Sequence, residues 1–160
     1  MSVSIRKAAA VLVTGIAAVT AASVSSASAA VARPQQASSA ARSVEAFVTN
    51  NSGCTMTLFS DSLSGGIWTI MPEFTVPNGA ATAWESESNG FMTGTEGVAS
   101  YRLSNCHNPA QNLKFANFHW NDPYYGSNSY DNAGTSAGVH IARSGGSGNN
   151  AIVTWVVTTS

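Results

Sequence analysis

The stretch SGGSGNNAIVTWVVTT, residues 144–159, decides the fold class of this chain. A glycine-rich turn leads into a run of mostly β-branched and aromatic residues, which favour an extended strand. Ala151, Val153, Trp155 and Val157 alternate with a second set of residues that is also largely apolar. The strand is therefore apolar on both faces, and we expect it to lie centrally in a sheet, with Trp155 in the core.

Segments of the same kind recur along the chain. Short runs of alternating or β-branched residues are separated by turns that contain Gly, Pro or Asn, and helical periodicity is hard to find. The expected strands cover residues 44–50, 54–61, 66–70, 80–86, 98–104, 113–120, 139–144 and 151–159. About eight short strands in a domain of ordinary size indicate a β-sandwich or barrel. We expect an all-β fold, a single β-sandwich of mostly antiparallel strands.

The start of the chain has a different composition. Arg6 and Lys7 precede an apolar run rich in Ala and Val, residues 8–24, and the small residues Ala-Ser-Ala follow at positions 27–29. A short basic end, an apolar middle and a small-residue cleavage site predict a secretory signal peptide over residues 1–29. A membrane anchor is the less favoured alternative. The predicted localisation is therefore secreted.

Residues 30–43 carry almost no large apolar side chain. A segment of this kind cannot bury enough surface to offset the entropy lost on ordering, so we expect a flexible tail. The sandwich domain is then expected over residues 44–160, as one domain without internal repeats.

The two cysteines of the chain, Cys54 and Cys106, both lie in the expected sandwich domain. An even number of cysteines in an exported chain favours a disulfide bond. The alternative, free thiols or metal ligands, finds no CxxC motif and no nearby pair of histidines.

Charged residues are sparse. Beyond the predicted signal peptide, five Lys and Arg residues stand against eight Asp and Glu residues, which leaves a net charge of −3. Nucleic-acid binding requires clustered cations that neutralise phosphates, and no such cluster is present. A nucleic-acid partner is therefore not expected.

The sequence holds no recognisable motif for metal binding or for nucleophilic catalysis. His107, His119 and His140 stand on separate expected elements, without a Cys/His cluster or a GxSxG serine. Asp122 and Asp131 are oxygen donors without the pattern of a calcium loop, and capping of turns is their commoner role. We expect no metal and no cofactor.

Three glutamates in WESESNGFMTGTEG, residues 84–97, are the remaining candidates for catalysis. Glu85 and Glu87 would share a strand face, and Glu96 follows a glycine-rich turn. Paired acids are what glycoside hydrolysis requires, but two acids two residues apart are also typical of a solvated strand face. We favour the solvated face and expect that the protein is not an enzyme.

Aromatic residues concentrate in FHWNDPYYGSNSYDN, residues 118–132. Tyr124, Tyr125 and Tyr130 are placed among Pro, Gly, Asn and Ser, and so polar a segment is expected to form an exposed loop. Rings with a polar tip suit a membrane headgroup region, a sugar or a protein partner. The alternative is that the rings only cover the open end of the sandwich.

These residues also resemble a known family. FHWNDPYYGSNSY is similar to the aromatic segment of the aegerolysins, in which a W-D-x-P-[WY]-x-G-S-N-like run follows a late strand. ESNGFMTGTEGVASYRL looks like the segment before it, and a looser likeness extends to the actinoporin-like lysins. The resemblance implies a small β-sandwich that recognises membrane lipids and cooperates with a second, pore-forming protein. Bacterial members include crystal-associated insecticidal proteins, so a cytolysin or toxin is implied as well.

The resemblance also implies a set of ligand-binding residues. They are Trp120, Asp122, Pro123 and Tyr125 in the aromatic run, with Trp84 and Glu87 before it. Tyr124 and Tyr130 complete the predicted binding residues because they lie among the turn residues of the same expected loop. The loop would place its rings at the level of the headgroups, while Asp122 and Glu87 would accept hydrogen bonds from an ammonium or hydroxyl group. The function expected first is a secreted lipid-binding protein, the recognition half of a lysin. The alternative is a carbohydrate-binding module or a protein inhibitor that uses the same loop.

Overall fold

Ten β-strands and one short 3-10 helix, but no α-helix, are found in residues 40–160, the part of the chain that the computed structural model describes. The predicted signal peptide (1–29) and most of the predicted tail (30–43) lie outside this range. Within the range, no helix has the length and hydrophobicity that crossing a bilayer requires. Ser43, the last residue of the predicted tail, is already the first residue of β1.

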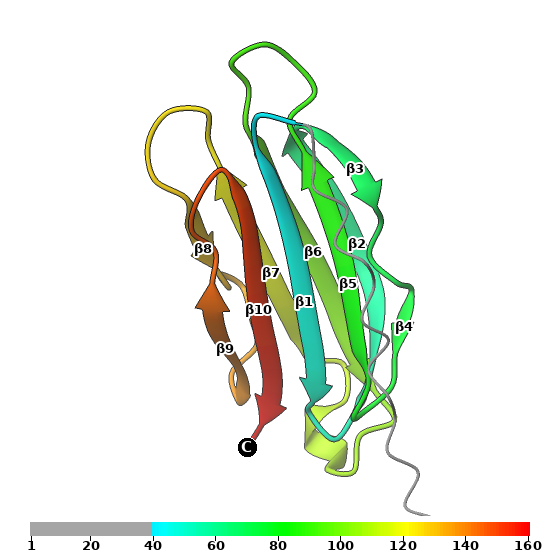
Figure 1. Cartoon of the computed structure of the whole chain (residues 1–160). Coiled ribbons are helices and arrows are strands. Elements are labelled where there is room, and N and C mark those ends of the chain that lie inside the picture. Colours follow the sequence, from blue (N-terminus) through cyan, green and yellow to red (C-terminus); the bar gives the residue numbers. More distant parts are fainter. Residues whose placement is uncertain (1–39) are drawn as a thin grey trace, which may run out of the picture. The chain divides into compact units, whose positions relative to one another are not determined.

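The strands form two sheets of five, which pack face to face over one core (Figure 1). The first sheet has the order β3-β5-β1-β10-β9 and consists of β1 (Ser43–Asn51), β3 (Ile67–Ile70), β5 (Ala81–Glu87), β9 (Val139–Gly145) and β10 (Asn150–Thr159). The second has the order β4-β2-β6-β7-β8 and consists of β2 (Thr55–Gly65), β4 (Thr75–Val76), β6 (Thr95–Ser104), β7 (Phe115–Asp122) and β8 (Ser129–Asp131). The 3-10 helix η1 (Pro109–Gln111) precedes β7.

The predicted β-sandwich is confirmed. All eight predicted strands are present, and the pairs are antiparallel except for β1 with β10, which is parallel. The structure adds two short strands, β4 and β8. The prediction that residues 129–131 belong to a loop is wrong, because β8 pairs with the end of β7. Two or three residues carry too little periodicity to reveal such a strand from the sequence.

Strand alternation determines which side chains enter the core. In β10, Ala151, Val153, Trp155 and Val157 are all buried, and the strand lies between β1 and β9, which confirms its predicted place inside a sheet. The opposite face of β10 is not covered, since Ile152 is 40% exposed. In β7 the alternation is strict, since Ala116, Phe118, Trp120 and Asp122 face inward while the residues between them face outward. β7 therefore places three apolar side chains and one carboxylate in the interior of the sandwich.

Aromatic rings fill the middle of the core. Trp84 lies 5.6 Å from Phe118, 5.8 Å from Trp120 and 5.9 Å from Trp155, measured between ring centroids. Gly97 of β6 faces Trp120, and a Cβ at this position would lie 2.6 Å from Cζ2 of the indole. A glycine is required here because the ring packs directly on the strand backbone.

The sandwich has two distinct ends (Figure 1). The loop after β5, residues 88–94, and the loop after β7, residues 123–128, extend from one end; together we call them the loop end. The turn between β1 and β2 and the 3-10 helix η1 lie at the opposite end, which we call the disulfide end.

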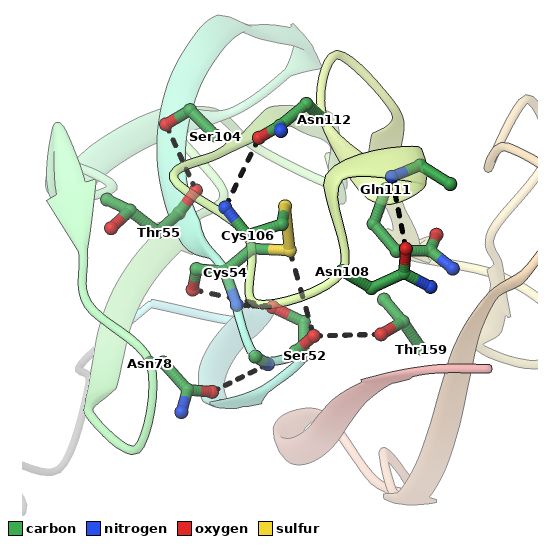
Figure 2. The surroundings of a disulfide bond; sticks show 12 residues. Ser52, Cys54, Thr55, Asn78, Ser104, Cys106, Asn108, Gln111, Asn112 and Thr159 are labelled. Atoms are coloured by element: carbon green, nitrogen blue, oxygen red, sulfur yellow. Dashed lines mark hydrogen bonds between the residues drawn. A yellow bond between two sulfur atoms is a disulfide. The ribbon is translucent and has the colours of Figure 1, made fainter.

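A disulfide bond joins Cys54 to Cys106, as predicted, and is surrounded by hydrogen bonds at this end of the sandwich (Figure 2). The N–H of Cys106 donates to Oδ1 of Asn112 at 3.2 Å, and Oγ1 of Thr159 donates to the Ser52 carbonyl at 2.8 Å. The bond therefore links the β1–β2 turn to the segment before β7, and the last strand is tied to the same turn.

Candidate functional site

Exposed aromatic and apolar side chains gather at the loop end. Phe91 is 92% exposed and Met92 is 40% exposed in the β5–β6 loop, while Tyr125 is 71% exposed in the β7–β8 loop. The two loops touch, since Oη of Tyr125 lies 3.9 Å from Sδ of Met92. Both loops therefore contribute apolar surface to one exposed patch, and Phe91 is its most exposed ring.

A hollow of about 500 Å³ lies next to this patch. Its polar lining includes Asn89 and Thr93 from the first loop, Glu96 at the start of β6 and Asn121 near the end of β7. Tyr124, Tyr125 and Pro123 form part of the wall, and among the residues that the structure describes Glu96 is the only charged one that lines the hollow. The site combines rings, amides, hydroxyls and a carboxylate, and a concave site that places a few polar groups among aromatic and apolar side chains is typical of ligand binding.

Arg42 holds the start of the β7–β8 loop in place. Its Nε donates to the Pro123 carbonyl at 2.9 Å, and its Nη2 donates to the Tyr124 carbonyl at 2.5 Å. The guanidinium carbon lies 5.2 Å from the centre of the Tyr124 ring, and Nε lies 3.5 Å from Oδ1 of Asp122. Arg42, which precedes β1, therefore fixes the backbone of the β7–β8 loop by its hydrogen bonds to two carbonyl oxygens.

Asp122 is buried beneath this loop rather than exposed in the hollow. Burial raises the pKa of its carboxyl group to about 6, although Arg42 and the backbone N–H of Ser43 both act to lower it. The prediction that Asp122 accepts a hydrogen bond from a ligand is therefore wrong. Its place at an inward position of β7 makes it the buried partner of Arg42.

We expect Asp122→Asn to change how stability depends on pH. Because the folded-state pKa is raised from 3.8 to about 6, the folded protein binds more protons between these values, so its stability falls as the pH rises through this window. An asparagine at this position does not titrate, so the variant does not lose stability as the pH rises through this window. Chemical denaturation should show similar stabilities of variant and wild type near pH 3.5, and a variant more stable by about 3 kcal/mol near pH 7.

The matched control for this prediction is Asp131→Asn. The N–H of Ala133 lowers the pKa of Asp131, so this carboxylate stabilises the fold at neutral pH and loses that effect as the pH falls. The control should therefore show a difference of the opposite sign. Parallel pH profiles for wild type and Asp122→Asn would contradict the assignment.

The tyrosines of the predicted binding loop separate in the structure. Tyr125 is exposed and Tyr124 is half-buried, and their rings meet edge to face at 4.8 Å. Tyr130 instead belongs to β8, packs 6.2 Å from the ring of Trp155, and is covered by the guanidinium of Arg143 at 5.0 Å. The prediction that Tyr130 lies in the exposed loop is wrong, because pairing with β7 turns its ring toward the core.

Two of the predicted ligand-binding tryptophans are also in the core. Trp84 and Trp120 are both fully buried, because each occupies an inward position of its strand. Nε1 of Trp120 donates to Oγ of Ser86 at 2.9 Å, and Thr95 donates to the same oxygen at 2.7 Å. Neither indole reaches the surface, so the prediction that these rings contact a ligand is wrong.

The three glutamates considered for catalysis divide between the two sheets. Glu85 and Glu87 point outward from β5, where burial and the neighbouring charges of Glu45 and Glu87 raise the pKa of Glu85. Glu96 points outward from β6 in the other sheet and lines the hollow. Glu87, predicted to accept a hydrogen bond from a ligand, is not among the residues that line the hollow.

The apolar pair Phe91 and Met92 and the clamp made by Arg42 were not predicted from the sequence. A signal for the pair was present, since NGFMTG places two large apolar residues inside a glycine-bounded turn where no strand alternation explains them. No such signal exists for Arg42, because its partners lie about eighty residues away in the chain.

Comparison with known proteins adds two similar solved structures. No protein-family model matches the sequence, and no curated protein matches it. The structure resembles the lipid-binding protein Nakanori with a TM-score of 0.60 and 16% identity, over 72% of this chain and 70% of that one. It also resembles the RahU protein in complex with a TRIS molecule, with a TM-score of 0.58 and 17% identity, over 75% of this chain and 96% of that one. At these identities the likeness establishes a shared fold.

Proposed function

We propose that the protein is a secreted, non-catalytic lipid-binding protein of the aegerolysin type that binds membranes through the loop end. The observation that carries this proposal is the group of Phe91, Met92 and Tyr125, which expose apolar surface beside a polar hollow. Large apolar side chains exposed together are costly in water and stabilised in the interfacial region of a bilayer. The hollow beside them receives a headgroup while the rings enter the interface.

The comparisons with solved structures establish the fold, and the ligands of those proteins support this proposal. One protein of the same fold is a lipid-binding protein, and another holds a TRIS molecule, which is a small amine with hydroxyl groups. The aegerolysin-like run from Trp120 to Ser127 ends β7 and contributes Asn121, Pro123, Tyr124 and Tyr125 to the lining of the hollow, so part of the run lies at the proposed site. Trp120 and Asp122 of this run are buried, so they support the loop from the core and do not line the hollow.

The proposed mode of binding is peripheral. The loop end provides a small contact surface, and the rest of the sandwich is held together by the core and the disulfide bond. In this mode the chain recognises a membrane and a second, pore-forming protein supplies any lytic activity. The two would together form a cytolysin, with this chain as the recognition component.

Phe91→Ala and Tyr125→Ala are each expected to weaken binding to lipid vesicles about tenfold or more. Transferring a phenylalanine side chain out of water contributes roughly 1.5–3 kcal/mol, and each 1.4 kcal/mol changes an affinity tenfold. Co-sedimentation with vesicles of several lipid classes measures the effect. Phe74→Ala is the matched control, since Phe74 is 69% exposed and directly precedes β4, outside the two loops that form the loop end.

Two results would contradict the proposal. One is the absence of binding to any vesicle, and the other is equal loss of binding in Phe74→Ala and Phe91→Ala, which would indicate nonspecific adsorption. A glycan array run in parallel tests the carbohydrate alternative. Binding to glycans that is lost in Tyr125→Ala, with no binding to vesicles, would replace the lipid by a sugar at the same site.

A further inference from the structure

An asparagine followed by glycine occurs twice in the part of the chain that the structure describes. Asn78 and Gly79 lie between β4 and β5, and Asn89 and Gly90 lie in the β5–β6 loop. This residue pair readily loses the side-chain amide of the asparagine, because glycine has no Cβ to shield its backbone nitrogen or to restrict its conformation. All four residues are exposed, so accessibility does not distinguish the two pairs. They differ in their hydrogen bonds.

Asn78 and Gly79 are both held by hydrogen bonds. The N–H of Gly79 donates to the Asn50 carbonyl at 2.6 Å, and Oδ1 of Asn78 accepts the N–H of Gly53 at 2.7 Å (Figure 2). The backbone nitrogen that would attack and the side chain that it would attack are therefore both bound to the end of β1 and the turn after it. They cannot approach each other unless these hydrogen bonds break.

Asn89 and Gly90 lack this restraint. Within residues 40–160, no hydrogen bond involves the side chain of Asn89 or the N–H of Gly90. Oγ1 of Thr93 donates to the Gly90 carbonyl at 3.0 Å, which leaves the nitrogen of Gly90 free to react. The fold therefore protects the first pair and exposes the second.

We propose that Asn89 is a site of spontaneous deamidation and that this reaction alters the loop end over time. The backbone nitrogen of Gly90 bonds to Cγ of Asn89, the bond from Cγ to Nδ2 breaks, and Nδ2 leaves as ammonia with the proton of the Gly90 N–H. Water then opens the cyclic imide at one of its two carbonyl carbons, which gives aspartate or isoaspartate. Water is the only co-reactant, and no group is oxidised or reduced.

Both products change the proposed binding site, and this part of the inference rests on the proposed function. Asn89 and Glu96 line the same hollow, so deamidation adds a second carboxylate there. In isoaspartate the main chain runs through the former side chain, which lengthens the backbone by one methylene group shortly before Phe91. We therefore expect the modified loop to present Phe91 in a different place and to bind vesicles more weakly.

The test incubates the full chain at mildly alkaline pH, where a backbone nitrogen loses its proton more readily, and locates each exchange of an amide for a carboxyl group by tandem mass spectrometry. Two hydrogen bonds must open before Asn78 reacts, so Asn89 should react at least about tenfold faster. In guanidinium chloride the two pairs should react at similar rates, because the fold no longer protects Asn78. Asn89→Gln should abolish the reaction at this position, since its longer side chain forms the ring poorly.

Equal rates at Asn78 and Asn89 in the folded protein would overturn the proposal, as would an unreactive Asn89 in a folded chain whose denatured form reacts. Fresh and incubated protein are then compared by co-sedimentation with vesicles. The modified fraction should bind about tenfold more weakly, as expected for Phe91→Ala, and incubated Asn89→Gln should keep the affinity of fresh protein.

The two measurements separate this inference from the proposed function. Deamidation at Asn89 that leaves vesicle binding unchanged supports the modification site and rejects its effect on the loop end. Fresh protein that binds no vesicle rejects the proposed function, while the mass spectra still decide whether Asn89 is the reactive residue.

Discussion

Replacing Trp120 with alanine is expected to lower the free energy of unfolding by about 4 kcal/mol, as is usual for removing a fully buried aromatic side chain. The indole has no exposed surface, and its ring lies 5.5 Å from that of Trp68 and 5.8 Å from that of Trp84. The substitution leaves a cavity beside Gly97 and removes one of the two donors to Oγ of Ser86. Guanidinium denaturation followed by circular dichroism measures the loss.

Tyr125→Ala is the control that separates stability from binding. Tyr125 is mostly exposed, so its removal should change the free energy of unfolding by no more than about 0.5 kcal/mol. The two variants should therefore fail in different ways: Trp120→Ala by unfolding, and Tyr125→Ala by loss of membrane affinity alone. A Trp120→Ala variant of native stability that no longer binds vesicles would show that the indole reaches the ligand, against its burial.

Removing the disulfide bond is expected to cost about 4 kcal/mol, since cross-linking two residues separated by 52 positions lowers the entropy of the unfolded chain by roughly that amount. The double variant Cys54→Ala, Cys106→Ser suits the two environments, because Cys54 is buried and Cys106 is partly exposed. Domains of this size commonly have 5–15 kcal/mol of stability, so the variant should be close to unfolded at elevated temperature. Denaturation of both proteins without reductant measures the difference.

Binding provides the control for the disulfide prediction. The bond lies at the end of the sandwich opposite the proposed site, so at low temperature, where the variant is folded, its affinity for vesicles should equal that of wild type (Figure 1). Adding reductant to wild type should reproduce the loss of stability. A double variant within 1 kcal/mol of wild type would contradict the prediction.

The segment that contains the candidate site could be predicted from the sequence, but most of the individual residues that form the site could not. The β7–β8 loop was identified by its tyrosines among turn residues, and Pro123, Tyr124 and Tyr125 do line the hollow. The other five predicted residues do not, since Trp84, Trp120 and Asp122 are buried, Tyr130 belongs to β8 and Glu87 points outward from β5. Composition reveals that a segment is rich in rings, but the direction of each ring depends on the strand to which its residue is paired.

Glu96, at the start of β6, is a residue of the hollow whose surroundings were not predicted from the sequence. Glu96 was considered as a catalytic acid or as part of a solvated face, whereas its neighbours in space are Asn121 and His119, more than twenty residues further along the chain. The ring of His119 lies 3.1 Å from Glu96 and 2.8 Å from Asp131, and this cluster exists because β6, β7 and β8 are adjacent in the sheet. No spacing in the sequence indicates this cluster, because each of the three residues comes from a different strand.

What the sequence determined by itself is the class of fold, its strands and its disulfide bond. Alternation with a period of two and turns marked by Gly, Pro and Asn are local properties, so they are legible in a single segment. Two cysteines within one domain leave only one intrachain pairing to choose. The face of each strand that enters the core, the burial of Asp122 and the clamp by Arg42 were decided by the tertiary structure alone. They depend on strand register and on contacts between distant segments, and a one-residue change of register would reverse every side chain of a strand.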